Sequence, residues 1–263
     1  MIRFCSLYSG SSGNCLFICA GSTKILIDAG VSGKKIIEAL YSIGEKPGEL
    51  SAILVSHEHS DHTKGAGIIS RKFDIPVYAN EKTWSAMQNS IGPIEVKNRL
   101  YFNSGVEFAL GNFVVMPFRI PHDAIEPVGF NFHFNGKKVT TATDIGHITK
   151  GLLKHFHMSD LLLLESNHDI EMLKVGPYPW HLKKRILGDN GHLSNEMAGK
   201  VISYLAENGT KRFLLGHLSR ENNFPELAYQ TVYNALTEKK LCVGEDVLLD
   251  VVLRDKVGEI IEI

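Results

Sequence analysis

The chain has 263 residues, of which 44% are hydrophobic and 22% charged, so its composition is that of a soluble globular protein and excludes a disordered one. A formal net charge of −1 excludes a basic field over the whole surface, although local basic patches remain compatible with it. The four cysteines lack the spacing of zinc knuckles or disulfide frameworks, and no apolar run approaches the ~20 residues that span a bilayer, so we expect a reduced, cytoplasmic protein without a membrane segment.

The first part of the chain predicts strands that alternate with helices. A helix over 32–43 is expected because Ile36, Ile37 and Leu40 share one face and Gly44 follows as a stop signal. Apolar runs between turn residues predict the strands. The expected strands are Ile2–Tyr8, Asn14–Ala20, Thr23–Asp28, Ala52–Val55 and Ile75–Tyr78, and further helices are expected near the end of Thr63–Phe73 and over Glu81–Asn89.

The second part predicts strands with short turns, and then helices and strands in alternation. The strands Val106–Leu110, Phe113–Phe118, Val128–Phe134 and Lys138–Thr143 include a hairpin turn at Asn135-Gly136. Next come helix His147–His155, strand Asp160–Glu165, helix Asn195–Glu207, strand Arg212–Leu215, helix Glu226–Leu236 and a closing strand pair, Val247–Leu253 with Val257–Ile261. No linker divides the chain, so we expect one domain over 1–263: an α/β fold with two stacked mixed sheets flanked by helices, an αββα sandwich.

A histidine-rich stretch follows the short apolar strand at 52–55. His57, His59, Asp61 and His62 lie within six residues, and imidazole nitrogens and carboxylate oxygens are the usual ligands of divalent transition metals. A loop at the strand end must bring these side chains together. The stretch therefore predicts a metal site.

Further residues of the same kind follow predicted strands downstream. His122, Asp144 and His217 each come directly after an apolar run. Because strand ends in layered α/β folds present side chains to a common mouth, ligands far apart in the sequence can meet there. With the histidine-rich stretch they provide seven candidate ligands, enough for two metal ions that share one carboxylate.

This pattern, His-x-His-x-Asp-His followed by His, Asp and His, resembles the metallo-β-lactamase superfamily over essentially the whole chain. The resemblance implies a dinuclear hydrolase in which Asp61 also orients water and Asp28 accepts a hydrogen bond from a ligand imidazole. The metals would be zinc or manganese, with iron also compatible. The implied ligands are His57, His59 and His122 for one ion, Asp61, His62 and His217 for the other, and Asp144 as the bridge.

Two further residues are candidates for protonating the leaving oxygen. Glu165 ends a predicted strand and His192 precedes a predicted helix. A carboxylate beside an imidazole keeps it protonated, which suits a general acid; alternatively, His192 only belongs to the start of that helix. The pair and its spacing to His217 are similar to tRNase Z, the tRNA-processing branch.

A second branch, WalJ (YycJ), is more similar. Its members resemble 5′→3′ exonucleases that act on double-stranded DNA, with a proposed part in mismatch repair. The resemblance implies DNA with a 5′ end as the substrate, and one departure is Cys15, where serine is expected. The matching segments are Tyr8–Asn14, Ser56–His62, His122–Gly129, Glu165–Asp169 and Gly216–Asn223.

Aromatic and basic residues between Glu165 and His192 suggest nucleic-acid contacts. Aromatic side chains stack on bases and cations contact phosphates, although the same residues would also fit a loop packed on the core. A Ser/Gly loop offers hydroxyls and amides to a phosphate, with a plain turn as the alternative. The predicted contacts are Tyr178, Trp180, Lys183, Lys184 and Arg185, then Arg220, Asn222 and Asn223, and Ser9, Ser11, Ser12 and Asn14 of the loop.

Three alternatives stay open. One is a hydrolase of small esters such as cyclic nucleotides, thioesters or lactones, which needs a compact pocket and no basic, aromatic clamp. Another is an RNA-processing nuclease, and a third is a metal-bound regulatory protein without turnover, which would not need Glu165 and His192. A flavin-linked diiron oxidoreductase is disfavoured because that branch resembles His-x-Glu where this chain has His59. The sequence leaves the oligomeric state unknown.

Overall fold

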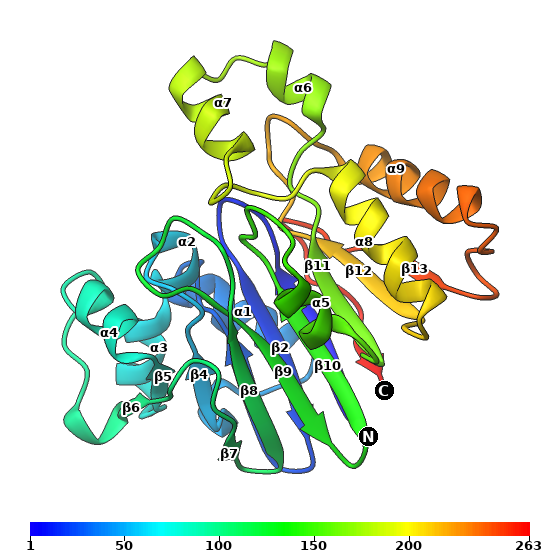
Figure 1. Cartoon of the computed structure of the whole chain (residues 1–263). Helices are drawn as coiled ribbons and strands as arrows, with labels where there is room; N and C mark the ends of the chain where they lie inside the picture. The colour runs from blue at the N-terminus through cyan, green and yellow to red at the C-terminus, as the bar shows by residue number, and fades with distance from the viewer. The chain divides into compact units, whose positions relative to one another are not determined.

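The computed structural model describes all 263 residues, which form two compact units. Unit 1 comprises Met1–Arg119, Ala124–Lys137 and Leu253–Ile263, and unit 2 comprises Ile120–Asp123 and Lys138–Val252. The strands belong to two mixed sheets, and helices flank them (Figure 1). The predicted fold class is therefore confirmed. The single domain over 1–263 stays a prediction.

Unit 1 contains a complete mixed sheet. Its strands are β1 (Ile2–Tyr8), β2 (Cys15–Ala20), β3 (Thr23–Ile27), β4 (Ala52–Leu54), β5 (Val77–Ala79), β6 (Arg99–Tyr101) and β14 (Ile261–Glu262). The hydrogen-bonded order is β14-β1-β2-β3-β4-β5-β6, antiparallel from β14 to β3 and parallel from β3 to β6. The carboxyl ends of β3 and β4 therefore lie at the same edge, which is where Asp28 and the histidine-rich stretch begin.

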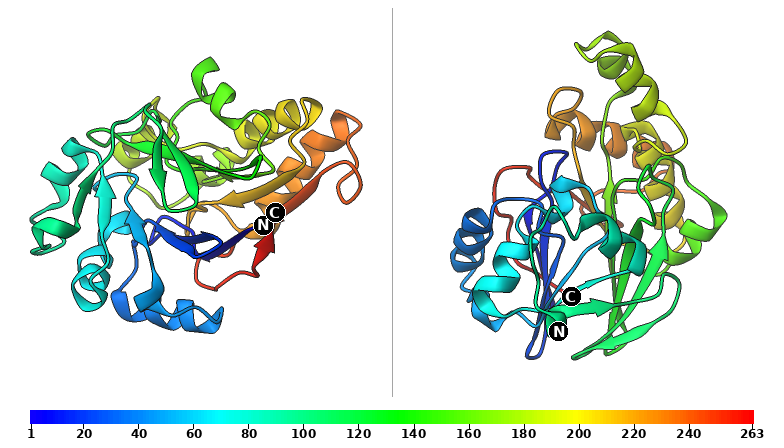
Figure 2. Two further views of the ribbon diagram at one scale, coloured as in Figure 1. Left: turned by 90° about the horizontal axis from the view of Figure 1, so that it is seen from below. Right: turned by 90° about the vertical axis from the view of Figure 1, so that its left-hand side faces the viewer.

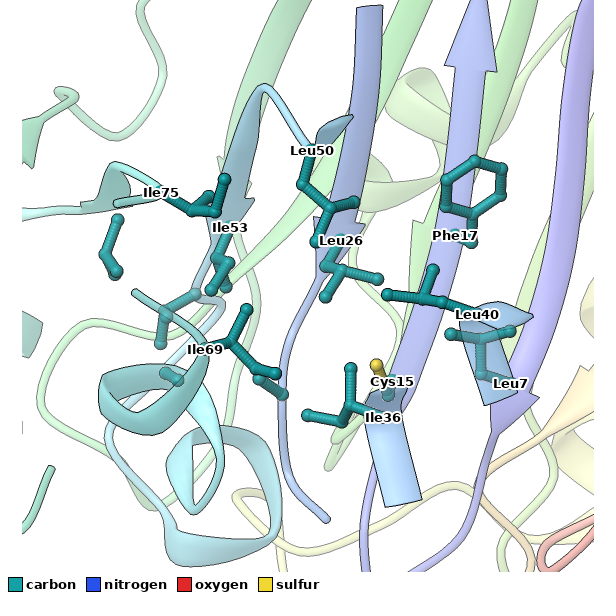
Figure 3. Packing of buried hydrophobic residues seen from close by; sticks show 14 of the residues in the cluster. Leu7, Cys15, Phe17, Leu26, Ile36, Leu40, Leu50, Ile53, Ile69 and Ile75 are labelled. Atoms are coloured by element: carbon teal, nitrogen blue, oxygen red, sulfur yellow. The ribbon is translucent and has the colours of Figure 1, made fainter. Parts of the chain in front are cut away.

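Helices cover one face of this sheet. They are α1 (Gly33–Ser42), α2 (Ser60–Thr63), α3 (Ala66–Phe73) and α4 (Glu81–Met87), with short 3-10 turns at Pro47–Glu49 and Val96–Asn98. Ile36 and Leu40 of α1 and Ile69 of α3 belong to a buried cluster with Leu26 and Ile53 of the strands, as Figure 3 shows. The apolar spacing that predicts α1 is thus the face that packs on the sheet.

A three-stranded antiparallel ribbon completes unit 1. Its strands are β7 (Phe108–Leu110), β8 (Phe113–Arg119) and β9 (Val128–Phe134). Aromatic contacts join it to the first sheet: the ring centroids of Tyr78 and Phe108 are 5.8 Å apart, and those of Phe102 and Phe130 are 5.7 Å apart. Apolar side chains thus fill the space between ribbon and sheet.

Unit 2 is a parallel sheet with helices. The strands are β10 (Lys137–Ala142), β11 (Leu161–Glu165), β12 (Arg212–Gly216) and β13 (Leu248–Val251), in the order β13-β12-β11-β10. The helices are α5 (Lys150–Phe156), α6 (Ile170–Val175), α7 (Trp180–Leu187), α8 (Asn195–Glu207) and α9 (Pro225–Glu238). The four leucines of β11 are fully buried, as expected for a parallel strand covered on both faces.

Several expectations about elements are wrong. The last two strands are not a pair: β13 pairs with β12, whereas β14 pairs with β1, because the chain between them turns to β1 and Gly258 N donates to Ser6 O at 2.8 Å. Helix α5 starts at Lys150 because the side chain of Thr149 caps it. The sequence does not predict strand β6, nor helices α6 and α7, whose helical pattern is obscured by Pro177 and Pro179. No helix has the length and apolar character needed to cross a membrane.

Candidate metal centre

In unit 1 the histidine-rich stretch turns sharply after β4. His59 is the N-cap of α2, so the expected strand-end loop is partly helical, and Asp61 and His62 lie within that single turn. His57 Nε2 and His59 Nδ1 are 3.1 Å apart, and Asp61 Oδ2 is 3.6 Å from His62 Nε2. Two nitrogens that bind one tetrahedral zinc ion at ~2.0–2.1 Å are about 3.3 Å apart, so the spacing of the first pair fits a shared ion.

Asp28 orients this cluster from the end of β3. Its carboxylate accepts hydrogen bonds from Ser56 N at 2.8 Å, Ser56 Oγ at 2.9 Å and His62 Nδ1 at 2.7 Å. With Nδ1 as the donor, His62 presents the lone pair of Nε2, which is the arrangement of metal-binding histidines. Ser56, which also lies 3.0 Å from His57 Nδ1, begins the matching segment Ser56–His62 but is not among the predicted site residues.

The Ser/Gly loop contacts the same cluster through Asn14. Asn14 Oδ1 accepts from Gly10 N at 3.1 Å, so its Nδ2 faces His62 Nε2 at 3.1 Å. Ser9 and Asn14 are buried, with 1% and 4% of their surface exposed, which argues against the predicted direct contacts of these two residues with nucleic acid. Asn14 instead holds the loop against the cluster, and Ser11 and Ser12 remain exposed.

In unit 2 a second cluster forms where the parallel strands end. Asp144 follows β10, Glu165 ends β11 and His217 follows β12, so register alone places them at one edge. The candidate ligand atoms of Asp144, Glu165, His192 and His217 all lie within 4.8 Å of one another. His122 joins them, with Nε2 at 3.7 Å from Asp144 Oδ1. Each unit therefore presents imidazole nitrogens and carboxylate oxygens suited to divalent metal ions.

Glu165 and His192 form the ion pair expected of a proton donor. Glu165 Oε1 accepts from His192 Nδ1 at 2.8 Å, and Oε2 accepts from the backbone N–H of Ile145 at 2.7 Å and of Leu193 at 3.1 Å. Burial lowers the pKa of His192, but the charge and hydrogen bond of Glu165, together with the charge of Asp144, outweigh burial and raise that pKa to about 9. Glu165 consequently favours the protonated form of His192.

Three residues of the two clusters have left-handed backbone. The φ angle is 59° at Asp28, 61° at Asp144 and 56° at His217. Side-chain-bearing residues adopt this region rarely, at a cost of about 1–2 kcal/mol each, and such strain concentrates at functional sites. The local sequence does not predict these angles, because aspartate and histidine adopt them more often than most residues but still only in a minority of cases.

The predicted aromatic and basic contacts lie on α7 and before it. Helices α6 and α7 extend away from the β10–β13 sheet in both Figure 1 and the right-hand view of Figure 2. Trp180 is 69% exposed and Lys184 is exposed, while Arg185 pairs with Asp123. The predicted phosphate contact of Lys183 is wrong. Lys183 is buried and its Nζ donates to Lys174 O at 2.7 Å, so it connects α7 to α6.

The predicted nucleic-acid contacts of Asn222 and Asn223 are also wrong. Both are buried, unlike Arg220, which is exposed. Asn223 Nδ2 donates to Ser166 O at 2.9 Å and to Asn167 O at 3.1 Å, so it joins the loops after β11 and β12. This role is structural, and it leaves no side-chain amide for DNA.

Asn223→Ala is therefore expected to lower the free energy of unfolding by about 2–3 kcal/mol, because buried carbonyl groups lose their donor. Urea unfolding followed by circular dichroism measures this. Arg220→Ala, which removes an exposed neighbouring side chain, should change stability by less than about 0.5 kcal/mol. Equal stability of the two variants would contradict the structural role.

A second stability prediction concerns His168. It is 1% exposed, neither ring nitrogen has a hydrogen-bond partner, and burial lowers its pKa from 6.5 to about 4. Between these two values the unfolded chain carries a proton that the folded chain does not, so stability falls as the pH falls through this window, by about 3 kcal/mol in total. Urea unfolding at several pH values should show that His168→Phe loses less stability than wild type as the pH falls. Parallel curves of stability against pH would contradict the assignment of this loss to His168.

This chain has mixed sheets with histidines and carboxylates at the strand ends, which is the arrangement of a metal-dependent hydrolase. Residues 23–218 match the family described as "Beta-lactamase superfamily domain". The chain belongs to that superfamily. It is 44% identical over 248 residues to the exodeoxyribonuclease YycJ of Bacillus anthracis, covering 93% of this chain and 92% of the relative. It is 42% identical over 246 residues to the exodeoxyribonuclease WalJ of Streptococcus pneumoniae, covering 93% and 91%.

A solved structure gives the same fold. The metallo-beta-lactamase fold protein YhfI of Bacillus subtilis matches 98% of each chain with a TM-score of 0.73 at 15% identity. At that identity the likeness shows the fold alone. The family match and the two relatives confirm the resemblance to the metallo-β-lactamase superfamily and to its WalJ (YycJ) branch.

Proposed function

We propose that this protein is a metal-dependent exodeoxyribonuclease that hydrolyses double-stranded DNA from a 5′ end. The observation that carries the chemistry is the hydrogen-bonded pair of His192 and Glu165 beside Asp144 and His217. The class of substrate is supported by the two relatives named exodeoxyribonuclease. The 5′→3′ direction, a cytoplasmic location and a part in mismatch repair belong to this proposal.

The metal ligands are proposed from family membership and the donor sets. When bound, two divalent ions, zinc or manganese with iron also compatible, supply positive charge opposite the phosphate and a nucleophile that is ionised at neutral pH. Asp28 fixes the tautomer of His62, and Asp61 orients water. The proposed sets are His57, His59 and His122 for one ion, Asp61, His62 and His217 for the other, and Asp144 as the bridge.

The chain's own residues supply the proton and bind the DNA strand. His192 donates its proton to the leaving oxygen, and Glu165 keeps the imidazole oriented through the bond to Nδ1. Trp180 and Lys184 are exposed on α7, where they stack on a base and contact a phosphate.

We expect purified protein loaded with zinc or manganese to release nucleotides stepwise from the 5′ end of labelled duplex DNA. Chelation should abolish the activity, and readdition of metal should restore it. Duplex DNA, single-stranded RNA and a nucleotide phenyl ester are compared in parallel. Turnover of the ester alone would favour the small-ester hydrolase, and endonucleolytic cleavage of RNA alone would favour an enzyme like tRNase Z.

A further inference from the structure

Arg254 lies against the Ser/Gly loop between β1 and β2. A Cβ atom added at Gly10 would lie 2.6 Å from Arg254 Cγ and 2.9 Å from Cδ, so the arginine side chain occupies the space that glycine leaves. The segment is fixed beside β1 by the bond from Gly258 N to Ser6 O and by the pairing of β14 with β1. Both views of Figure 2 show this red segment close to the dark blue start of the chain.

The guanidinium of Arg254 is mostly buried without a hydrogen-bond acceptor. Its Nε and Nη1 atoms are inaccessible and make no hydrogen bond, and the side chain as a whole is 20% exposed. The nearest carboxylate oxygen, Asp255 Oδ2, is 3.8 Å from Nε, which is too far for a hydrogen bond. A buried donor without an acceptor costs about 1–3 kcal/mol, so a movement of the side chain that brings these covered donors to an anion is favoured.

The loop beside Arg254 has donors for the same anion. Ser11 and Ser12 are exposed at the tip of a turn that the bond from Gly13 N to Gly10 O closes at 2.9 Å. The turn is tightly packed, since a Cβ at Gly13 would lie 2.5 Å from Val31 Cγ1. A planar guanidinium and two hydroxyls on a fixed turn match the tetrahedral oxygens of a phosphate.

The loop is also connected to the metal centre of unit 1. Gly10 N donates to Asn14 Oδ1, and Asn14 Nδ2 lies 3.1 Å from His62 Nε2. The loop that Arg254 contacts is therefore linked through Asn14 to a proposed metal ligand.

We propose that Arg254, with Ser11 and Ser12, forms a binding site for a phosphate of the DNA strand next to the one that is cleaved. This inference rests on the proposed function. The phosphate is either the 5′-terminal monoester or a diester of the backbone, since both present the same oxygens to the arginine.

The test compares wild type, Arg254→Ala and Arg254→Lys, with Lys256→Ala as the matched control, because Lys256 is an exposed cation of the same segment. Arg254→Ala should raise KM for duplex DNA by about tenfold or more, with a much smaller change in kcat, and flatten the salt dependence of binding by about one charge. Arg254→Lys keeps the charge without the planar fork, so an intermediate KM is expected. Lys256→Ala should behave as wild type.

Binding of labelled duplexes by chelated protein, followed by fluorescence anisotropy, separates this site from the proposed activity. A loss confined to 5′-phosphorylated ends identifies the terminal monoester, and an equal loss for 5′-hydroxyl ends identifies a backbone diester. Either result supports the site if thermal melting shows Arg254→Ala to be folded. Unchanged binding by Arg254→Ala, or equal losses in Lys256→Ala, overturns it. A wild type that binds but never cleaves DNA refutes the proposed function alone.

Discussion

Asp144→Asn is expected to lower DNA hydrolysis by about 10³-fold or more, because the variant loses the negative charge at the middle of the unit 2 cluster. Asp144 Oδ1 lies 3.7 Å from His122 Nε2, and Oδ2 lies 3.4 Å from His217 Nδ1. Asparagine keeps the size of the side chain and tolerates left-handed backbone, so the fold should be retained. Elemental analysis should find less bound metal, alongside the loss in kcat/KM.

The control for Asp144 is Glu207→Gln. Glu207 ends α8 and pairs with Lys239 at 3.5 Å on the surface, so its substitution removes the same charge at a residue that is not a proposed ligand. Its activity and metal content should stay within about twofold of wild type, since an exposed ion pair contributes about 0–1 kcal/mol. Full activity and full metal content in Asp144→Asn would eliminate Asp144 as the bridge.

The second large effect is expected for His192→Ala, which should lower hydrolysis of ordinary DNA by about 10²–10⁴-fold because the leaving oxygen is no longer protonated. Replacing that oxygen by sulfur in the substrate removes most of the need for a proton, since a thiolate is a good leaving group. The variant should therefore recover most of its deficit on the sulfur-containing DNA. An equal deficit on both substrates would show that His192 is not the proton donor.

Glu165→Gln provides a pH readout for the same pair. Burial lowers the pKa of His192 and Glu165 raises it, so the variant should have a lower pKa at this imidazole. A general acid works only while protonated, and the activity of Glu165→Gln should therefore fall at a lower pH than that of wild type. A single-turnover pH–rate profile measures the shift; identical profiles would argue against the pairing as the source of the cation.

Much of the fold follows from local patterns. Strand β9 and helix α8 have the predicted bounds, and β11 is predicted to within one residue, because apolar runs and helical spacing are set by neighbours in the sequence. The site of unit 2 follows from the same information. Once Asp144, Glu165 and His217 are placed after parallel strands, sheet geometry alone brings them to one edge.

The remaining differences depend on partners that are distant in the sequence. Lys183 looks like a surface cation, but the fold places the Lys174 carbonyl within its reach. Asn223 looks like a polar loop residue, yet two carbonyls after β11 require its amide. Arg254 and Gly10 come from opposite ends of the chain, and only the folded structure brings the side chain of one over the backbone of the other.

The left-handed backbone at Asp28, Asp144 and His217 has a consequence for how the protein would respond to selection. Glycine relieves this strain, by about 1 kcal/mol at each position. A library screened only for heat resistance should therefore accumulate glycine at these positions and lose the carboxylates and imidazole that they carry. Directed evolution toward a more robust protein would then erode the chemistry unless activity is screened in the same round.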